Sequence, residues 1–83
     1  MKKYNVTLDY IRNEDYYIES NLQEFQVSAN NTDEAIEIVK NKLSNHMLND
    51  DDFEAICYSN GNADITFGDS DTGQDVCYEI IEL

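Results

Sequence analysis

Hydrophobic and polar residues alternate from position 4 to position 10 of the chain. Tyr4, Val6, Leu8 and Tyr10 occupy one side of an extended segment, and polar residues stand between them. This period of two predicts a half-buried β-strand with these four side chains in the core. Residues 24–29 alternate in the same way and predict a second strand.

The segment 31–43 predicts the one helix of the chain. Asn31 and Glu34 have the spacing of a capping box, in which each side chain bonds a backbone N–H of the first turn. Acidic residues at the start and lysines at the end suit the helix dipole, as does His46 just beyond the helix. The apolar positions recur at helical intervals: Ala35, Ile36, Val39 and Leu43.

The dipeptide Asn60-Gly61 is the strongest short hairpin signal in the chain. It predicts two strands, over 53–59 and 62–67, joined by a two-residue turn. The pairs expected from this turn are Tyr58 with Ala63, Ile56 with Ile65, and Glu54 with Phe67. In that register the core side carries Ile56, Tyr58, Ala63, Ile65 and Phe67, and the other face carries Ala55, Cys57, Asp64 and Thr66.

A turn at 68–74 and a last strand over 75–82 complete the order β-β-α-β-β-β. Consecutive hairpins give antiparallel neighbours, and a single helix covers only one face of a sheet. We therefore predict an α+β fold, with residues 1–83 as a single domain in which one helix packs on a mostly antiparallel sheet. The uncovered face is the expected place for function, and an open sheet edge allows a monomer or a homodimer.

Charge is distributed unevenly between the two halves of the chain. No lysine or arginine follows Lys42, so residues 43–83 contribute ten of the thirteen net negative charges. Self-repulsion of this size opposes the compact state, and the asymmetry indicates a basic partner surface. The chain itself is expected to be repelled by nucleic acid rather than to bind it.

Catalysis, cofactors and membranes are not indicated. The chain has one histidine, no Ser-His-Asp arrangement, no glycine-rich phosphate loop and no CxxC metal spacing, so we expect neither an enzyme nor a cofactor or metal. No apolar stretch is long enough for a membrane span, and the N-terminus lacks the apolar run of a signal peptide. These features favour a cytoplasmic protein, in which Cys57 and Cys77 stay unpaired.

The loop from Asp69 to Asp75 has oxygen ligands at alternate positions and a glycine at the bend, as calcium loops do. Its glycine is fifth rather than sixth, and Ile80 stands where an EF-hand has glutamate. We therefore favour a polar turn between two strands, with calcium binding as an alternative.

Carboxylates spread along the strands and two tyrosines are the candidate partner contacts. Residues two apart on a strand lie about 6.6 Å from one another on one face, a spacing that can imitate a row of phosphates. Tyr16 and Tyr17 combine aromatic and acidic surroundings suited to stacking on arginine. The candidate contact residues are Glu14, Asp15, Tyr16, Tyr17, Glu19, Asp50, Asp51, Asp52, Asp64, Asp69, Asp71, Asp75 and Glu79.

In size, acidity and element order, and in the strand-to-helix passage FQVSANNTDEA from Phe25 to Ala35, the chain resembles the small acidic inhibitors of bacteriophages and mobile elements, above all the anti-CRISPR proteins. The resemblance implies a protein of the bacterial host cell that blocks a CRISPR effector by occupying its positively charged DNA channel. The alternative is an acidic protein–protein interaction module of a phage or mobile element that does not mimic DNA.

Overall fold

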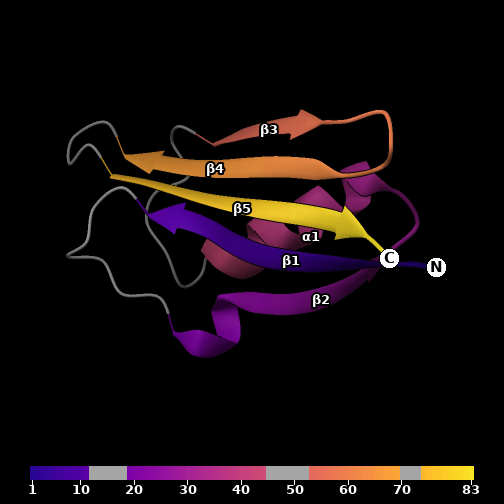
Figure 1. The fold of residues 1–83 in the computed structure, drawn as a ribbon, viewed down its shortest axis with the longest axis horizontal. Helices are drawn as coiled ribbons and strands as arrows, with labels where there is room; N and C mark the ends of the chain where they lie inside the picture. The colour runs from indigo at the N-terminus through magenta and orange to yellow at the C-terminus, as the bar shows by residue number, and fades with distance from the viewer. Residues whose placement is uncertain (12–18, 45–52, 70–73) are drawn as a thin grey trace.

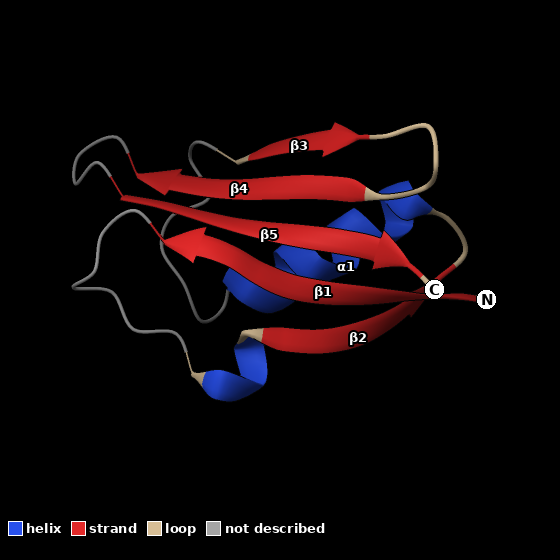
Figure 2. Ribbon diagram, viewed as in Figure 1, coloured by secondary structure: helices blue, strands red, loops and turns tan. Residues whose placement is uncertain are grey.

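Five antiparallel strands form one sheet, and one helix packs on one of its faces (Figures 1 and 2). The computed structural model describes residues 1–11, 19–44, 53–69 and 74–83. The elements in chain order are β1 (Lys2–Ile11), the short 3-10 helix η1 (Ser20–Leu22), β2 (Glu24–Ala29), α1 (Thr32–Ser44), β3 (Glu54–Cys57), β4 (Ala63–Asp69) and β5 (Gln74–Glu82). The predicted fold class and element order are confirmed.

The last strand lies at the centre of the sheet, whose order is β2-β1-β5-β4-β3. A central strand is covered by neighbours on both edges, which suits the apolar character of 76–81, where Glu79 is the one charged residue. The pairing of β5 with β1 brings the chain ends together, and the Leu83 amide donates to the Lys3 carbonyl at 2.9 Å. Figure 1 shows both termini at the same end of the sheet.

The hydrophobic core fills the space between α1 and the face of the sheet that the helix covers. The helix contributes four buried side chains, which are Ala35, Ile36, Val39 and Leu43. The fully buried sheet residues around them are Tyr4, Val6, Ala29, Ala63, Ile65, Phe67, Val76, Tyr78 and Ile80. These helix positions are the ones that the sequence pattern predicts.

The start of α1 forms the predicted cap. The Asn31 side-chain oxygen accepts the Glu34 amide at 2.8 Å, and the first intrahelical bond joins the Ala35 amide to the Asn31 carbonyl. The Glu34 carboxylate bonds back to the Asn30 backbone amide and side chain. Glu34 therefore reaches one residue further back than in a standard capping box.

The register predicted for the β3–β4 hairpin is wrong by one residue. The loop between the strands has three residues rather than two, because the Tyr58 amide bonds the Asn62 carbonyl at 2.9 Å and Gly61 takes a φ of +90°. Such a loop adds one residue to the turn, so the whole strand changes its pairing. The observed pairs are Glu54 with Thr66, Ala55 with Ile65, Ile56 with Asp64, and Cys57 with Ala63.

This shift exchanges the two faces of β3. Side chains alternate along a strand, so a slip of one residue moves each of them to the opposite side. Ile56 and Tyr58, predicted in the core, lie on the uncovered face and are 57% and 48% exposed. Ala55 and Cys57 turn to the helix side, where the Cys57 thiol lies 3.8 Å from a carboxylate oxygen of Asp33.

A bulge in β1 corrects a second prediction. The pairing of β1 with β5 shifts between Leu8 and Tyr10, so Asp9 is an extra residue in the strand. Tyr10 then faces away from the core, opposite Cys77, and is 49% exposed. The predicted alternation holds for Tyr4 and Val6, which are fully buried, and fails beyond the bulge.

The two buried tyrosines Tyr4 and Tyr78 differ in their hydrogen bonding, so we expect the substitution to phenylalanine to affect stability differently at each. Tyr78 donates its hydroxyl to the Leu22 carbonyl at 2.8 Å, whereas the Tyr4 hydroxyl has no hydrogen-bond partner among the residues described. Tyr78→Phe is expected to cost about 1 to 2 kcal/mol, because the Leu22 carbonyl loses its donor, and Tyr4→Phe to be neutral or stabilising by about 1 kcal/mol. Urea unfolding measures both. Equal losses would contradict the difference in bonding.

Candidate binding surface

The face of the sheet opposite α1 carries polar and acidic side chains, and Figure 2 shows no helix in front of it. We call it the open face. Strand pairing assigns its residues, because partners in a register point to the same side. Its acidic residues are Asp9, Glu24, Glu54, Asp64, Asp75 and Glu79. Its other central residues are Asn5, Thr7, Tyr10, Ile56, Tyr58, Thr66, Cys77 and Ile81.

One row of residues crosses the whole sheet at right angles to the strands. Thr7 on β1 pairs with Glu24 on β2 and with Glu79 on β5, and Glu79 pairs with Asp64 on β4, which pairs with Ile56 on β3. Neighbouring strands lie about 4.8 Å apart. The row therefore places three carboxylates within about 14 Å, with Glu79 directly opposite Asp64.

Glu79 and Asp64 are like charges directly opposite one another, an arrangement that destabilises an antiparallel pair. The other two carboxylates of the row, Asp64 and Glu24, each accept a hydrogen bond from a neighbouring side chain. Tyr58 donates its hydroxyl to Asp64 Oδ2 at 2.5 Å, and Thr7 donates to Glu24 Oε2 at 3.5 Å. Among the residues described, none donates to the Glu79 side chain. Within this row, Glu79 is thus the carboxylate most available to an outside cation.

The carboxylates of this row affect the pKa of the Tyr58 hydroxyl. Its hydrogen bond to Asp64 raises the pKa of the phenol, and the carboxylates of Asp64 and Glu79 add to the effect. The phenol therefore stays protonated at neutral pH and keeps acting as a donor to Asp64.

Cys77 lies beneath the centre of the open face. Burial is the main cause that raises the pKa of its thiol, and the carboxylates of Asp9, Asp64 and Glu79 raise it further. A buried thiol with a raised pKa is a poor nucleophile. Cys77 and the exposed Cys57 are both free, as predicted.

Basic residues are nearly absent from the open face. Lys3, near the end of β1, is its one basic residue in the part of the chain that the structure describes. Lys2 is on the helix side, 3.0 Å from Glu82. Lys40 and Lys42 lie over the rings of Phe53 and Phe25, which pack at the margins of the core. The fold thus separates most positive charge from the acidic face.

Five of the thirteen candidate contact residues lie in the part of the chain that the structure describes. Asp64, Asp75 and Glu79 lie on the open face. Glu19 is exposed just before η1, away from the row. Asp69 ends β4, and only its backbone is described. The remaining candidates lie outside the described residues: Glu14, Asp15, Tyr16, Tyr17, Asp50, Asp51, Asp52 and Asp71. Most of the proposed calcium loop lies outside them as well.

The sequence interpretation missed several residues of this surface. Asp9 lies on β1, which pairs with β5 and brings it near Cys77, and Glu24 lies on β2, where its partner Thr7 stands between it and Glu79. A two-residue hairpin loop predicts Ile56 and Tyr58 in the core, whereas the observed three-residue loop places them on the open face. The sequence does carry one signal for the open face. Glu54, Ile56 and Tyr58 are spaced two residues apart and share one side of a strand, so a core position for Ile56 and Tyr58 would also bury the Glu54 carboxylate.

The residues that the structure describes contain no group of three or more His, Cys, Asp or Glu side chains arranged to hold a metal ion. None of their helices has the length and apolar character needed to cross a membrane.

Comparison with protein-family models, with curated proteins and with solved structures yields no match for this chain.

Proposed function

We propose that this protein is a non-enzymatic inhibitor whose open face occupies the basic, nucleic-acid-binding surface of another protein in place of DNA. The observation that supports this proposal is the open face itself, where six carboxylates accompany a single lysine among the residues described. A surface of one sign attracts a partner of the opposite sign from a distance and raises the rate of association.

The arrangement of the carboxylates supports competition with DNA in particular. Across the strands, Asp64 and Glu79 lie about 4.8 Å apart, and Glu24 lies two strands from Glu79, about 10 Å away. Along β5, Asp75 and Glu79 share the open face four residues apart, a distance of about 13 Å. Asp64 and Glu79 repel each other in the free protein, and a bound cationic surface removes that repulsion. Binding of a cationic surface at this pair therefore recovers the free energy that the repulsion costs the free protein.

CRISPR effectors are the partner class that we propose first. Their channels are lined with basic side chains that hold nucleic acid through its backbone charge. An acidic sheet face that enters such a channel excludes the target DNA without any chemical step. This choice of class rests on the resemblance in size, acidity and element order.

The test is a binding measurement at two salt concentrations with a purified effector and a competing DNA duplex. We expect binding that weakens steeply as salt rises and that DNA displaces. The variant Asp64→Asn/Glu79→Gln removes the paired charges at the centre of the row, and its affinity at low salt is expected to fall about fivefold to tenfold. Its free energy of unfolding is expected to rise slightly, because the like-charge pair is gone.

The matched control is Asp33→Asn/Glu37→Gln, which removes the same charge from exposed positions on α1. Its binding is expected to stay within about twofold of the wild type. Equal losses in the two double variants would show that net charge, and no particular face, governs binding, and would overturn the proposal.

An acidic interaction module without DNA mimicry is the second candidate, and the exposed apolar side chains of the open face favour it. Tyr10, Ile56 and Tyr58 are about half exposed on that face. A partner held mainly by these side chains would bind with little dependence on salt and would not compete with DNA. The two-salt measurement therefore separates the two functions.

A further inference from the structure

The exposed apolar side chains of this protein are concentrated on the open face. Among the described residues, six large hydrophobic side chains are exposed. Met1 and Leu83 are the chain ends, and Ile38 lies on α1. The other three, Tyr10, Ile56 and Tyr58, all lie on the open face. Aromatic and aliphatic side chains gathered on an uncovered surface mark interaction sites.

The Tyr58 ring is held in place beside the acidic row. Its hydroxyl donates to Asp64 Oδ2 at 2.5 Å, and Glu79 and Cys77 lie within electrostatic reach of it. Tyr58 lies two residues after Ile56, just beyond the end of β3, and Ile56 pairs with Asp64. Tyr58 therefore offers a fixed, half-exposed aromatic surface next to two carboxylates.

The Asp64–Glu79 pair is suited to a cation that carries several hydrogen-bond donors. Asp64 and Glu79 are opposite one another, and no described residue donates to Glu79. Asp64 uses one oxygen for Tyr58 and keeps another acceptor oxygen. A planar group with parallel N–H donors can bond to both carboxylates at once and cover the ring with its face.

We infer that the partner anchors on the open face through an arginine, whose guanidinium stacks on the Tyr58 ring and bonds to Asp64 and Glu79. This inference rests on the proposed function. Arginine combines a rigid fork of donors with a weakly hydrated plane that stacks on aromatic rings, whereas the lysine ammonium is a compact, strongly hydrated point charge. A second copy of this chain does not suit the face, because each copy carries a net charge of −13.

The test uses two fluorescent peptides of equal length and charge, one rich in arginine and one rich in lysine, with affinities measured by anisotropy at one moderate salt concentration. The wild type is expected to bind the arginine peptide about threefold to tenfold more tightly than the lysine peptide. Tyr58→Leu is expected to reduce this ratio to about one, because the apolar contact remains and the aromatic face is lost. Tyr58→Phe keeps the ring and is expected to retain the preference.

Other results would overturn the arginine anchor alone or the proposed function as well. Equal affinity of the wild type for both peptides would overturn the arginine anchor, as would a preference that survives Tyr58→Leu. The proposed function would stand in both cases if Asp64→Asn/Glu79→Gln still weakened binding more than the α1 control. Failure of that double variant to weaken either peptide would overturn both proposals. Circular dichroism checks that each variant is folded, which is expected because Tyr58 is half exposed.

Discussion

Phe67→Ala is expected to lower the free energy of unfolding by about 3 to 5 kcal/mol, the usual cost of removing a buried phenylalanine. Phe67 is fully buried on β4, and its ring centroid lies 5.1 Å from that of Phe53. The alanine variant leaves a cavity in the core between α1 and the sheet. Urea unfolding is the appropriate measurement, because guanidinium is a salt and would screen the repulsion among the carboxylates.

Ile56→Ala is the control that makes this prediction specific. Ile56 is 57% exposed on the edge strand β3, so its truncation is expected to change stability by no more than about 0.5 kcal/mol. A two-residue turn at Asn60-Gly61 would instead place Ile56 opposite Ile65 in the core. A loss of several kcal/mol in Ile56→Ala would therefore show that the observed hairpin register is wrong.

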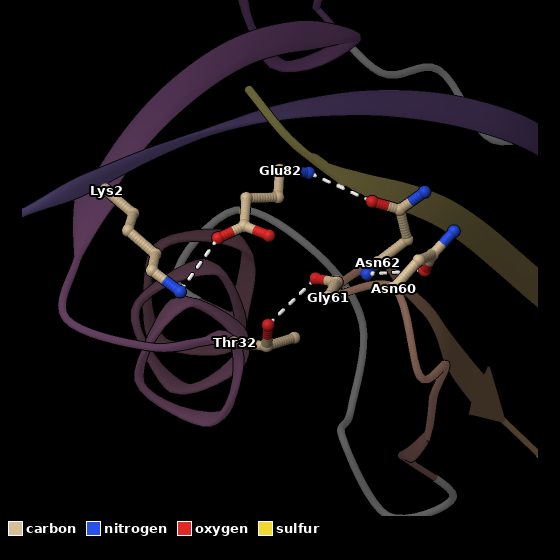
Figure 3. A network of polar contacts seen from close by, with 6 residues as sticks. All are labelled: Lys2, Thr32, Asn60, Gly61, Asn62 and Glu82. Carbon is tan, nitrogen blue, oxygen red and sulfur yellow. Dashed lines mark hydrogen bonds and ion pairs between the residues drawn. The ribbon is translucent and has the colours of Figure 1, made fainter.

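Gly61→Ala is expected to lower the free energy of unfolding by about 2 to 3 kcal/mol. Gly61 has a φ of +90°, a conformation that an L-residue adopts only with strain. A Cβ atom there would also meet the Glu82 carboxylate, which Figure 3 shows between Gly61 and Lys2. The same loop carries the Gly61 carbonyl, which accepts the Thr32 hydroxyl at 2.8 Å and ties the hairpin to the start of α1.

A double-mutant cycle separates the two causes of this loss. In a Glu82→Ala background the contact with the carboxylate is gone, so Gly61→Ala is expected to cost only the backbone strain, about 1 to 2 kcal/mol. Glu82→Ala alone removes the surface ion pair with Lys2, which contributes little. An unchanged cost of Gly61→Ala in the Glu82→Ala background would show that the carboxylate yields freely and that the backbone conformation accounts for the whole effect.

The register of β3 also determines which side chains the open face presents to a partner. The three-residue loop at Gly61 sets the register of β3, and that register places Ile56 and Tyr58 beside Asp64. With a two-residue turn, the same sequence would bury Tyr58 and leave the acidic row without an aromatic neighbour. The proposed arginine anchor therefore depends on one residue of loop length.

Local signals in the sequence determined the elements and their order. The alternation of 24–29 and the capping and apolar spacing of 31–43 depend on neighbours a few residues apart, and both agree with the structure. The excess of carboxylates after Lys42 is likewise a property of the sequence alone. Such signals are readable because helix and strand periods repeat within one element.

Tertiary structure alone decided which residues share a face. Asn60-Gly61 is compatible with a two-residue or a three-residue loop, and β1 gives no local sign of the bulge at Asp9, yet each choice reverses the side chains beyond it. The central position of β5 is also a long-range pairing, and it brings Glu79 between Thr7 and Asp64. The sequence by itself therefore determined that this protein is an acidic α+β domain. The arrangement of its acids around Tyr58 was decided by contacts between distant strands, because a period of two makes every face depend on exact register.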